Sequence, residues 1–216
     1  MTEEPRATPP SAARLAEEVA TEPTAVLGET DAVALGTLVW EPALDRPDLL
    51  AEPVRAALAD LAAHDPDAAS QVLVAEIDPD LADTAAMTEA YELPLVASAN
   101  CVLVAGRRGG EERVAACVVR ATTRADVNNV VRRLLDVRKA SFWPMDQAVA
   151  ASGMEYGGIT PVGVPAAWRL LVDAHAATGH AIVGSGIRGS KILLPGEVLA
   201  ALPGAEVVEG LGLPID

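Results

Sequence analysis

The sequence predicts an α/β fold of the α+β type, with a mixed β-sheet flanked by helices. Short apolar runs of strand length alternate imperfectly with helical stretches, which argues against a doubly wound parallel sheet. Two neighbouring runs are joined by a short turn with two glycines, as in an antiparallel hairpin. Half of the 216 residues are hydrophobic, so the chain can bury one sizeable core.

Strands and helices alternate up to residue 120. The predicted elements are a strand over 33–40, a helix over 47–63, a strand over 71–77, a helix from Asp83 or Thr84 to Tyr91, and strands over 99–105 and 113–120. Pro42 closes the first strand, and Pro53 fits the first turn of a helix, so the regular helix begins near Glu52. Gly109 and Gly110 suit the turn of the hairpin.

The second half predicts further elements of both kinds. They are helices over 123–137 and 145–152, strands over 168–172, 181–183 and 192–194, a helix over 195–202 and a strand over 205–208. Thr123 is the expected cap of the first of these helices, Asp146 lies in the first turn of the second, and Gly153 ends it.

The N-terminal segment differs from the rest in composition. It mixes Pro, Thr, Glu and Ala with few aromatic or β-branched residues. We therefore interpret residues 1–46 as an N-terminal extension and expect its first 30 or so residues to be mobile.

Charge is unevenly distributed along the chain. The formal net charge is -15, which disfavours unselective binding to a polyanion. Residues 107–139 nevertheless hold nine basic and four acidic side chains, a local charge of +5, so the remainder carries -20. This segment is either a face that receives a nucleic-acid end or an arginine-rich helix and hairpin in contact with solvent.

Several classes of protein and site are disfavoured. No run of about 18 apolar residues occurs, and the N-terminus is acidic and rich in proline, so we expect a cytoplasmic protein without a membrane segment. Cys101 and Cys117 lie in apolar runs and are interpreted as inert core thiols. The three histidines are scattered at surface positions without a metal or triad pattern, so no metal and no cofactor is expected.

Two glycine-rich loops are the best candidates for a binding site. The first, MEYGGITPVGVP, spans residues 154–165, and the second, GSGIRGSK, spans residues 184–191. Backbone amides in such loops can approach a small ligand closely. The second loop matches GxGxxG, but the residues after it favour a strand, so the helix that would hold a pyrophosphate is missing. Ordinary structural turns are the alternative for both loops.

Together the two loops resemble the YbaK family, whose domains are associated with prolyl-tRNA synthetase and edit misacylated tRNA. The family's Gly-Gly-x-(Ser/Thr)-Pro-x-Gly loop is matched by Gly157, Gly158, Thr160, Pro161 and Gly163, and its later Gly-x-x-Gly turn by Gly186 and Gly189. The resemblance implies a partly barrel-like central sheet and a deacylase domain over residues 47–216.

The chain departs from the family pattern at one important position. Family members usually carry a lysine that contacts the substrate, at the start of the strand that corresponds to residues 99–105, and this chain has Asn100 there. Asparagine donates and accepts hydrogen bonds but brings no charge. Substrate affinity or rate should therefore fall unless Arg188 or Lys191 compensates.

The resemblance implies hydrolysis of the ester at the 3′ end of a misacylated tRNA, with release of a small amino acid. It also implies contact with an aminoacyl-tRNA synthetase. The implied substrate-binding residues are Asn100, Gly157, Gly158, Thr160, Pro161, Gly163, Gly184, Gly186, Arg188, Gly189 and Lys191. The main alternative is a catalytically silent binding module for a small amino-acid-like ligand or a protein partner, which Asn100 and the acidic charge favour. A hydrolase of small free esters or amides has no positive support.

Overall fold

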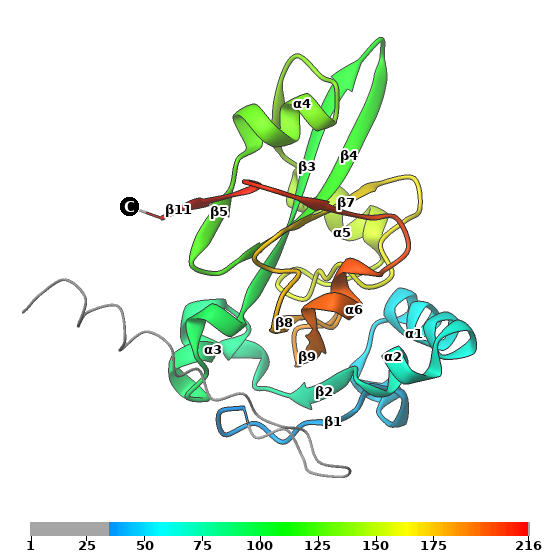
Figure 1. The fold of residues 1–216 in the computed structure, drawn as a ribbon, viewed down its shortest axis with the longest axis vertical. Coiled ribbons are helices and arrows are strands. Elements are labelled where there is room, and N and C mark those ends of the chain that lie inside the picture. The colour runs from blue at the N-terminus through cyan, green and yellow to red at the C-terminus, as the bar shows by residue number, and fades with distance from the viewer. Residues whose placement is uncertain (1–34, 216) are drawn as a thin grey trace, which may run out of the picture. The chain divides into compact units, whose positions relative to one another are not determined.

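A computed structural model describes residues 35–215 of the chain (Figure 1). The α-helices are α1 (Glu52–His64), α2 (Pro66–Ser70), α3 (Thr84–Ala90), α4 (Arg132–Leu134), α5 (Met145–Ser152) and α6 (Gly196–Ala200). The 3-10 helices are η1 (Ala43–Asp45), η2 (Pro47–Leu49), η3 (Pro79–Leu81) and η4 (Leu95–Ala97), and η5 (Val127–Val131) is a π-helical turn. The strands are β1 (Glu41–Pro42), β2 (Leu73–Glu76), β3 (Ala99–Arg108), β4 (Glu111–Arg120), β5 (Thr123–Ala125), β6 (Ala140–Phe142), β7 (Arg169–Asp173), β8 (His180–Gly184), β9 (Ser190–Pro195), β10 (Ala205–Val208) and β11 (Gly212–Pro214).

The strands form three sheets. One has the order β1-β2-β9-β8, and all its neighbouring pairs are antiparallel. Another has the order β10-β7-β4-β3-β6; its first two pairs are parallel and its last two antiparallel. The third pairs β11 with β5. The prediction of a mixed sheet flanked by helices is confirmed, and within the described residues the sheets do not close into a barrel.

The two larger sheets meet at a single backbone bridge. Ser98 pairs with Ile182 of β8 immediately before β3 begins at Ala99. From this point β3 continues into the five-stranded sheet, while β8 belongs to the four-stranded sheet. The first residues of β3 therefore lie beside β8 without forming a ladder with it, and this junction borders the cavity described below.

A buried arginine binds the backbone segments on both sides of this junction. Arg120, the last residue of β4, is only 8% exposed. Its guanidinium donates hydrogen bonds to the backbone carbonyls of Ala97, His175, Thr178 and His180. Because a buried guanidinium needs partners for its donors, these four bonds link the residues before β3 with the turn before β8.

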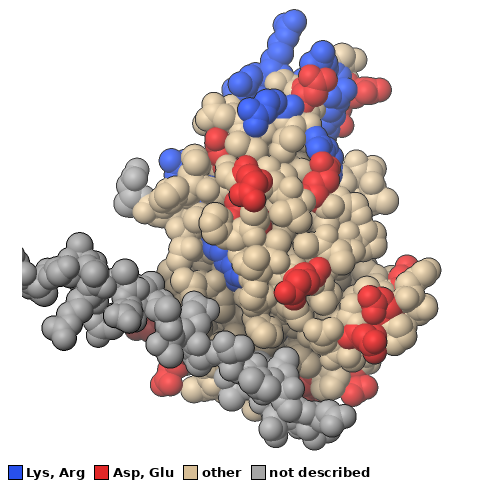
Figure 2. Space-filling model, viewed as in Figure 1, with Lys and Arg blue, Asp and Glu red and all other residues tan. Residues whose placement is uncertain are grey.

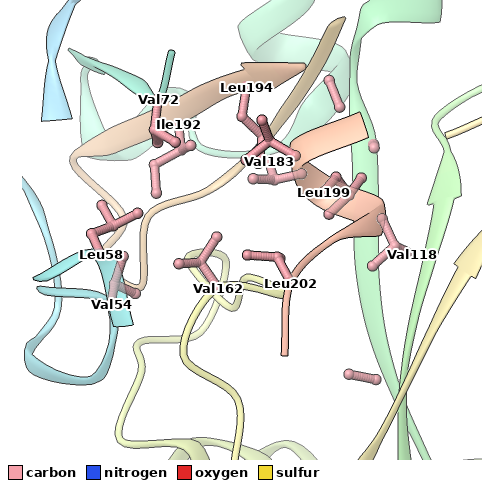
Figure 3. Packing of buried hydrophobic residues seen from close by; sticks show 14 of the residues in the cluster. Val54, Leu58, Val72, Val118, Val162, Val183, Ile192, Leu194, Leu199 and Leu202 are labelled. Carbon is pink, nitrogen blue, oxygen red and sulfur yellow. The ribbon is translucent and has the colours of Figure 1, made fainter. Parts of the chain in front are cut away.

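Two apolar cores support the sheets. The larger one includes Leu58 of α1, Ile192 and Leu194 of β9 and Leu199 of α6, all at most 1% exposed (Figure 3). The smaller core lies between the β3–β4 hairpin and the η5–α4 segment, where Val104 and other buried residues meet Val131 and Leu135. The hairpin and the η5–α4 segment are therefore held as one unit.

The element order follows the sequence prediction in most places. The helix expected to begin near Glu52, the hairpin at Gly109 and Gly110, the helix over 145–152 and the strand over 205–208 are confirmed. Among the described residues, none of the helices is long and apolar enough to cross a membrane. The expected mobility of the first 30 or so residues lies outside the described range. Pairing of β1 with β2 brings residues before 47 into contact with the rest of the fold, and the domain boundary after residue 46 stays a prediction.

The strand predicted over 33–40 is wrong for its described part. From residue 35 to residue 40 the backbone is irregular, with a turn at Gly36, and only Glu41–Pro42 pairs with β2. The apolar side chains of Leu38 and Trp40 are buried, and the Trp40 indole donates to the Leu35 carbonyl. The apolar run thus reflects burial of side chains without strand pairing.

The helix predicted over 123–137 is also wrong at its start. Residues 123–125 form β5 instead, which pairs with β11 almost ninety residues later in the chain. Asp126, and not Thr123, caps the helical segment, since its carboxylate accepts from the Asn129 amide at 3.1 Å. A π-helical turn and a short α-helix follow. The periodic valines predicted the buried face of the helical segment correctly. Residues 123–125 are not helical because they pair with the distant strand β11.

Candidate functional site

A cavity of about 340 Å³ lies at the junction of the two larger sheets. Its walls come from the segment before α3, the start of β3, the first glycine loop and the strands β8 and β9. The lining residues are Ala82, Asp83, Thr84, Met87, Ser98, Ala99, Asn100, Cys101, Val102, Tyr156, Gly157, Ile159, Ile182, Val183, Gly184 and Lys191. Most of the wall is apolar, and polar groups converge on it from α3, β3 and β9. This is the usual composition of a site for a small ligand.

The two glycine-rich loops converge on this cavity. The Gly186 amide donates to the Gly158 carbonyl at 2.7 Å, and the Glu155 amide donates to the Gly186 carbonyl at 2.8 Å. A Cβ on Gly158 would lie 2.5 Å from the Ile187 carbonyl oxygen, and one on Gly184 would lie 2.3 Å from the Gly158 oxygen. Glycine is required at both positions because the two backbones touch.

Lys191 of β9 is the central polar residue of the cavity. It is 7% exposed, and its ammonium donates to the backbone carbonyls of Ala82 at 3.0 Å and Gly157 at 3.3 Å. Burial and, to a smaller extent, the nearby Arg188 lower the pKa of Lys191 to about 8, while Asp83 opposes the shift. An ammonium has three donors, so one remains for a ligand in the cavity.

Asn100 lies in the same cavity at the start of β3. Its side-chain oxygen accepts a hydrogen bond from the Thr84 hydroxyl at 2.8 Å, which fixes the side chain against α3. Within residues 35–215 no group accepts a hydrogen bond from the Asn100 amide nitrogen. This nitrogen is therefore free to donate to a ligand. The neighbouring Ser98 hydroxyl is buried and has no hydrogen-bond partner in the described part of the chain.

Asp83 adds a carboxylate to the cavity wall. It holds the N-cap position of α3, as the sequence indicated, but its side chain makes no capping hydrogen bond. Asp83 is exposed, and its carboxylate has no ion-pair or hydrogen-bond partner among the described residues. The sequence indicated Asp83 and Thr84 only as possible helix caps and gave no sign of Ser98, because the proximity of these residues depends on how the sheets meet.

The other predicted site residues lie further from the cavity. Thr160 is completely buried, and its hydroxyl accepts from the Val162 amide. Pro161 and Gly163 line a separate hollow of about 560 Å³ next to α1, α2 and α6. A Cβ on Gly163 would lie 2.4 Å from the Pro53 carbonyl oxygen, so this glycine allows the loop to pack on α1. These three residues support the loop without lining the cavity.

Arg188 and Gly189 lie at the outer side of the second loop. The Arg188 guanidinium donates to the carbonyls of Pro79 and Tyr156, and its centre lies 5.8 Å from the Tyr156 ring centroid. The Gly189 carbonyl accepts from the Ile77 amide at 2.9 Å. Neither residue lines the cavity; Arg188 acts on it through its charge, since it lowers the pKa of Lys191.

The cysteines and histidines differ in part from expectation. Cys117 is fully buried and burial raises its pKa to about 12, whereas Cys101 is half-buried and lines the cavity, with its pKa also raised by burial. All three histidines are exposed, but His175 has a carboxylate neighbour that the sequence did not suggest, Asp173 at 3.0 Å. In the described part of the chain, no group of three or more His, Cys, Asp or Glu side chains could hold a metal ion.

Comparison with known proteins identifies the family of the chain and its fold. The family model of the aminoacyl-tRNA editing domain matches residues 78–202, more than half of the chain. The chain belongs to this family. The matched range contains both glycine loops, Asn100 and Lys191, so the cavity lies within the editing domain. No curated protein sequence matches the chain.

Solved structures show the same fold at low identity. A protein described as having a proposed trans-editing role for prolyl tRNA synthetase superposes with a TM-score of 0.60 at 17% identity, covering 74% of this chain and 97% of that one. Hypothetical protein APE2540 superposes with a TM-score of 0.61 at 15% identity, covering 73% and 99%. The resemblance to the YbaK family that the loops indicated is confirmed.

The contact between the loops leads to a stability prediction. Replacing Gly158 by Ala forces a Cβ into the Ile187 backbone, and we expect a loss of about 2–3 kcal/mol in the free energy of unfolding. Gly189→Ala is the matched control in the same structure, because its Cβ would meet nothing closer than 3.8 Å and should change stability by less than about 0.5 kcal/mol. Urea denaturation of both variants measures the difference. Equal stabilities would contradict the close approach at Gly158.

Proposed function

We propose that this editing domain hydrolyses the ester that joins a small amino acid to the 3′-terminal adenosine of a misacylated tRNA. The observation that carries the proposal is the Lys191 ammonium, buried in a largely apolar cavity next to Asn100 within the editing domain. The products are the free amino acid and deacylated tRNA. Association with an aminoacyl-tRNA synthetase is part of the proposal.

Lys191 supplies the positive charge that Asn100 cannot. In the family pattern a lysine stands at the Asn100 position, whereas here the ammonium reaches the same cavity from β9. Two of its donors are held by carbonyls, which leaves the third for the substrate. A charged donor in a site that excludes water stabilises an ester oxygen as negative charge develops on it. We assign Lys191 to this oxygen and the Asn100 amide to the aminoacyl group.

The hydrolysis needs no nucleophilic side chain from the protein. Water attacks the ester carbonyl, the C–O bond to the ribose breaks, and the ribose oxygen leaves with a proton. Placing the ester beside Lys191, the Gly157 backbone and an ordered water favours this path, because orientation and charge stabilisation together lower the barrier. The neighbouring ribose hydroxyl of the tRNA lies next to the ester oxygen, and we assign to it the orientation of the water.

The size and lining of the cavity favour a small amino acid. About 340 Å³ has to hold the aminoacyl group and part of the terminal ribose. Met87, Ile159 and Ile182 close the apolar part of the wall. The apolar wall favours a small uncharged side chain, because a charged one would have to leave water.

Asp83 gives the cavity a group for the α-ammonium of the substrate. Its carboxylate is unoccupied within the described range and lies close enough to Lys191 to raise the pKa of that residue. An aminoacyl ester carries a positive amino group and a polarised carbonyl a few bonds apart. Asp83 and Lys191 are a matching pair of opposite charges, and we assign the amino group to Asp83.

The alternative, a catalytically silent binding module, rested on the loss of charge at Asn100 and on the acidic net charge. Lys191 restores a positive charge to the cavity. Membership of the editing family also favours the enzyme over the binding module.

The proposed role of Lys191 makes the reaction depend on pH. The fraction of protonated Lys191 falls as the pH rises through about 8, so we expect the enzyme-catalysed rate, corrected for spontaneous hydrolysis, to fall over the same range. Lys191→Met should lower kcat about 100-fold at pH 7 and abolish this pH dependence.

The pKa of the lysine is depressed, so its charged form is the unfavourable one in the folded protein. That destabilisation is full below pH 8 and is relieved as the pH rises toward 10.5, so Lys191→Met should keep its stability at pH 7. A rate that rises through pH 8 in step with the wild-type lysine losing its proton would show that Lys191 acts as a base instead.

A rescue experiment tests whether Lys191 replaces the lysine of the family pattern. In the double variant Asn100→Lys with Lys191→Met, one ammonium again faces the cavity, and we expect at least a tenfold gain over Lys191→Met alone. Asn100→Lys on its own places two ammonium groups in one cavity and should not exceed the wild type. Deacylation of a panel of mischarged tRNAs measures all three variants. A double variant as slow as Lys191→Met would contradict the substitution of one lysine by the other.

The Asp83 assignment is tested with a substrate that lacks the amino charge. Wild-type protein should deacylate an N-acetylated aminoacyl-tRNA about tenfold more slowly than the free-amino form, because a charge-assisted hydrogen bond is lost. Asp83→Asn should reduce this difference, whereas Asp80→Asn, an exposed residue outside the cavity, should retain it. The ratio of kcat/KM for the two substrates is the measurement. Unchanged discrimination in Asp83→Asn would remove the residue from the site and leave the proposed reaction intact.

A further inference from the structure

One end of this acidic protein carries a group of basic side chains. Figure 2 shows them over the free end of the β3–β4 hairpin and over α4, while acidic side chains are scattered over the rest of that view. We call this group the hairpin face; its exposed basic residues are Arg107, Arg108, Arg132, Arg133, Arg138 and Lys139. Three exposed acidic residues, Glu111, Glu112 and Asp136, share it, so its net charge is +3 on a chain of -15.

The cations of the hairpin face are only partly neutralised. Arg107 pairs with Glu112 at 3.6 Å, and Arg108 pairs with Asp136. Among the described residues, no carboxylate pairs with the four remaining cations, which lie on α4 and just after it. Four unpaired cations on one small surface repel each other, and an anionic partner would remove that repulsion.

The hairpin face and the cavity lie at opposite ends of the same strand. Asn100 borders the cavity near the start of β3, and Arg107 lies seven residues further along it. At about 3.4 Å per residue the two positions are roughly 24 Å apart. A stacked nucleic-acid strand advances about 3.4 Å per nucleotide, so roughly seven nucleotides bridge them. A substrate whose last nucleoside enters the cavity is long enough to reach the hairpin face only if it is a polynucleotide.

An exposed aromatic ring lies between the two ends. Phe142 of β6 pairs with Val104 in the middle of β3 and is 63% exposed, although it is the only phenylalanine of the chain. Unstacked bases bind to exposed aromatic rings, and arginines bind to the phosphates that follow. From the start of β3 to its end, the cavity therefore comes first, Phe142 on the neighbouring strand β6 second and the hairpin face last.

We propose that the hairpin face binds the phosphate backbone of the tRNA whose 3′ end occupies the cavity. The inference rests on the proposed function and adds the surface that holds the body of the substrate. It also accounts for the charge distribution, because a protein with a net charge of -15 then offers nucleic acid an attractive surface at the hairpin face. Binding at this surface aligns the acceptor end with the cavity.

The test compares a long and a short substrate in two charge-matched double variants. Arg132→Gln with Arg133→Gln removes two cations of the hairpin face, and Arg46→Gln with Arg55→Gln removes two cations elsewhere. We measure kcat and KM for an aminoacyl-tRNA and for the corresponding aminoacyl-adenosine, which fills the cavity but cannot reach the hairpin face. The salt dependence of tRNA binding is measured by fluorescence anisotropy with uncharged tRNA.

Only the double variant of Arg132 and Arg133 should differ from the wild type, and only with aminoacyl-tRNA as the substrate. Loss of the two arginines of the hairpin face should raise KM for aminoacyl-tRNA about tenfold, leave kcat and the hydrolysis of aminoacyl-adenosine unchanged, and make the slope of log K against log salt shallower by about 2. The control variant should match the wild type.

Other outcomes overturn the proposal. An unchanged KM for aminoacyl-tRNA, or equal losses with both substrates, would remove tRNA from the hairpin face, and tighter binding to phosphatidylserine vesicles than to tRNA would assign the face to a membrane. If wild-type protein hydrolyses neither substrate, the proposed reaction fails. The anisotropy measurement still decides the hairpin face in that case, because weaker tRNA binding by the Arg132 and Arg133 double variant supports it and unchanged binding refutes it.

Discussion

The backbone contact between the two glycine loops is the constraint on which the site depends. At Gly158 and at Gly184 a side chain would collide with the backbone of the opposite loop, so both positions require glycine. The Gly186 amide also donates a hydrogen bond of 2.7 Å to the Gly158 carbonyl across this contact. This contact fixes the position of the Gly157 carbonyl, and that carbonyl in turn accepts from the Lys191 ammonium. A small shift of either loop would therefore move the only ammonium that lines the cavity within the described range.

The cavity keeps a lysine in a place where burial opposes its charge. Desolvation and Arg188 lower the pKa of Lys191 to about 8, and Asp83 together with two carbonyls acts against complete loss of the charge. The result is an ammonium that is mostly protonated at neutral pH and poorly hydrated. Such a group interacts more strongly with a developing negative charge than a surface lysine does, because water does not compete for its donor.

The sequence predicted the parts of this site that are local and missed the parts that depend on distant pairing. The glycine loops were recognisable because tight turns and close backbone approach need glycine, and Lys191 was named because it lies in one of these loops. Asp83, Thr84 and Ser98 were not recognisable, since the bridge from Ser98 to Ile182 joins residues more than eighty positions apart. The same limitation explains the wrong helix start at Thr123, where pairing with β11 overrides the local helical pattern.

On the proposed assignment, the position of the Lys191 charge allows a chain with asparagine at the family's lysine position to carry out the same reaction. The stabilisation of a substrate oxygen depends on the position and the charge of the donor in the cavity, whichever strand carries that donor. Here β3 contributes a neutral amide held by Thr84, and β9 contributes the ammonium from the other side of the junction between the sheets. The two strands belong to different sheets, so the geometry of their junction determines whether both groups can contact one substrate. A comparison confined to β3 would find no charged side chain in the cavity, whereas in the folded chain β9 brings the Lys191 ammonium into it.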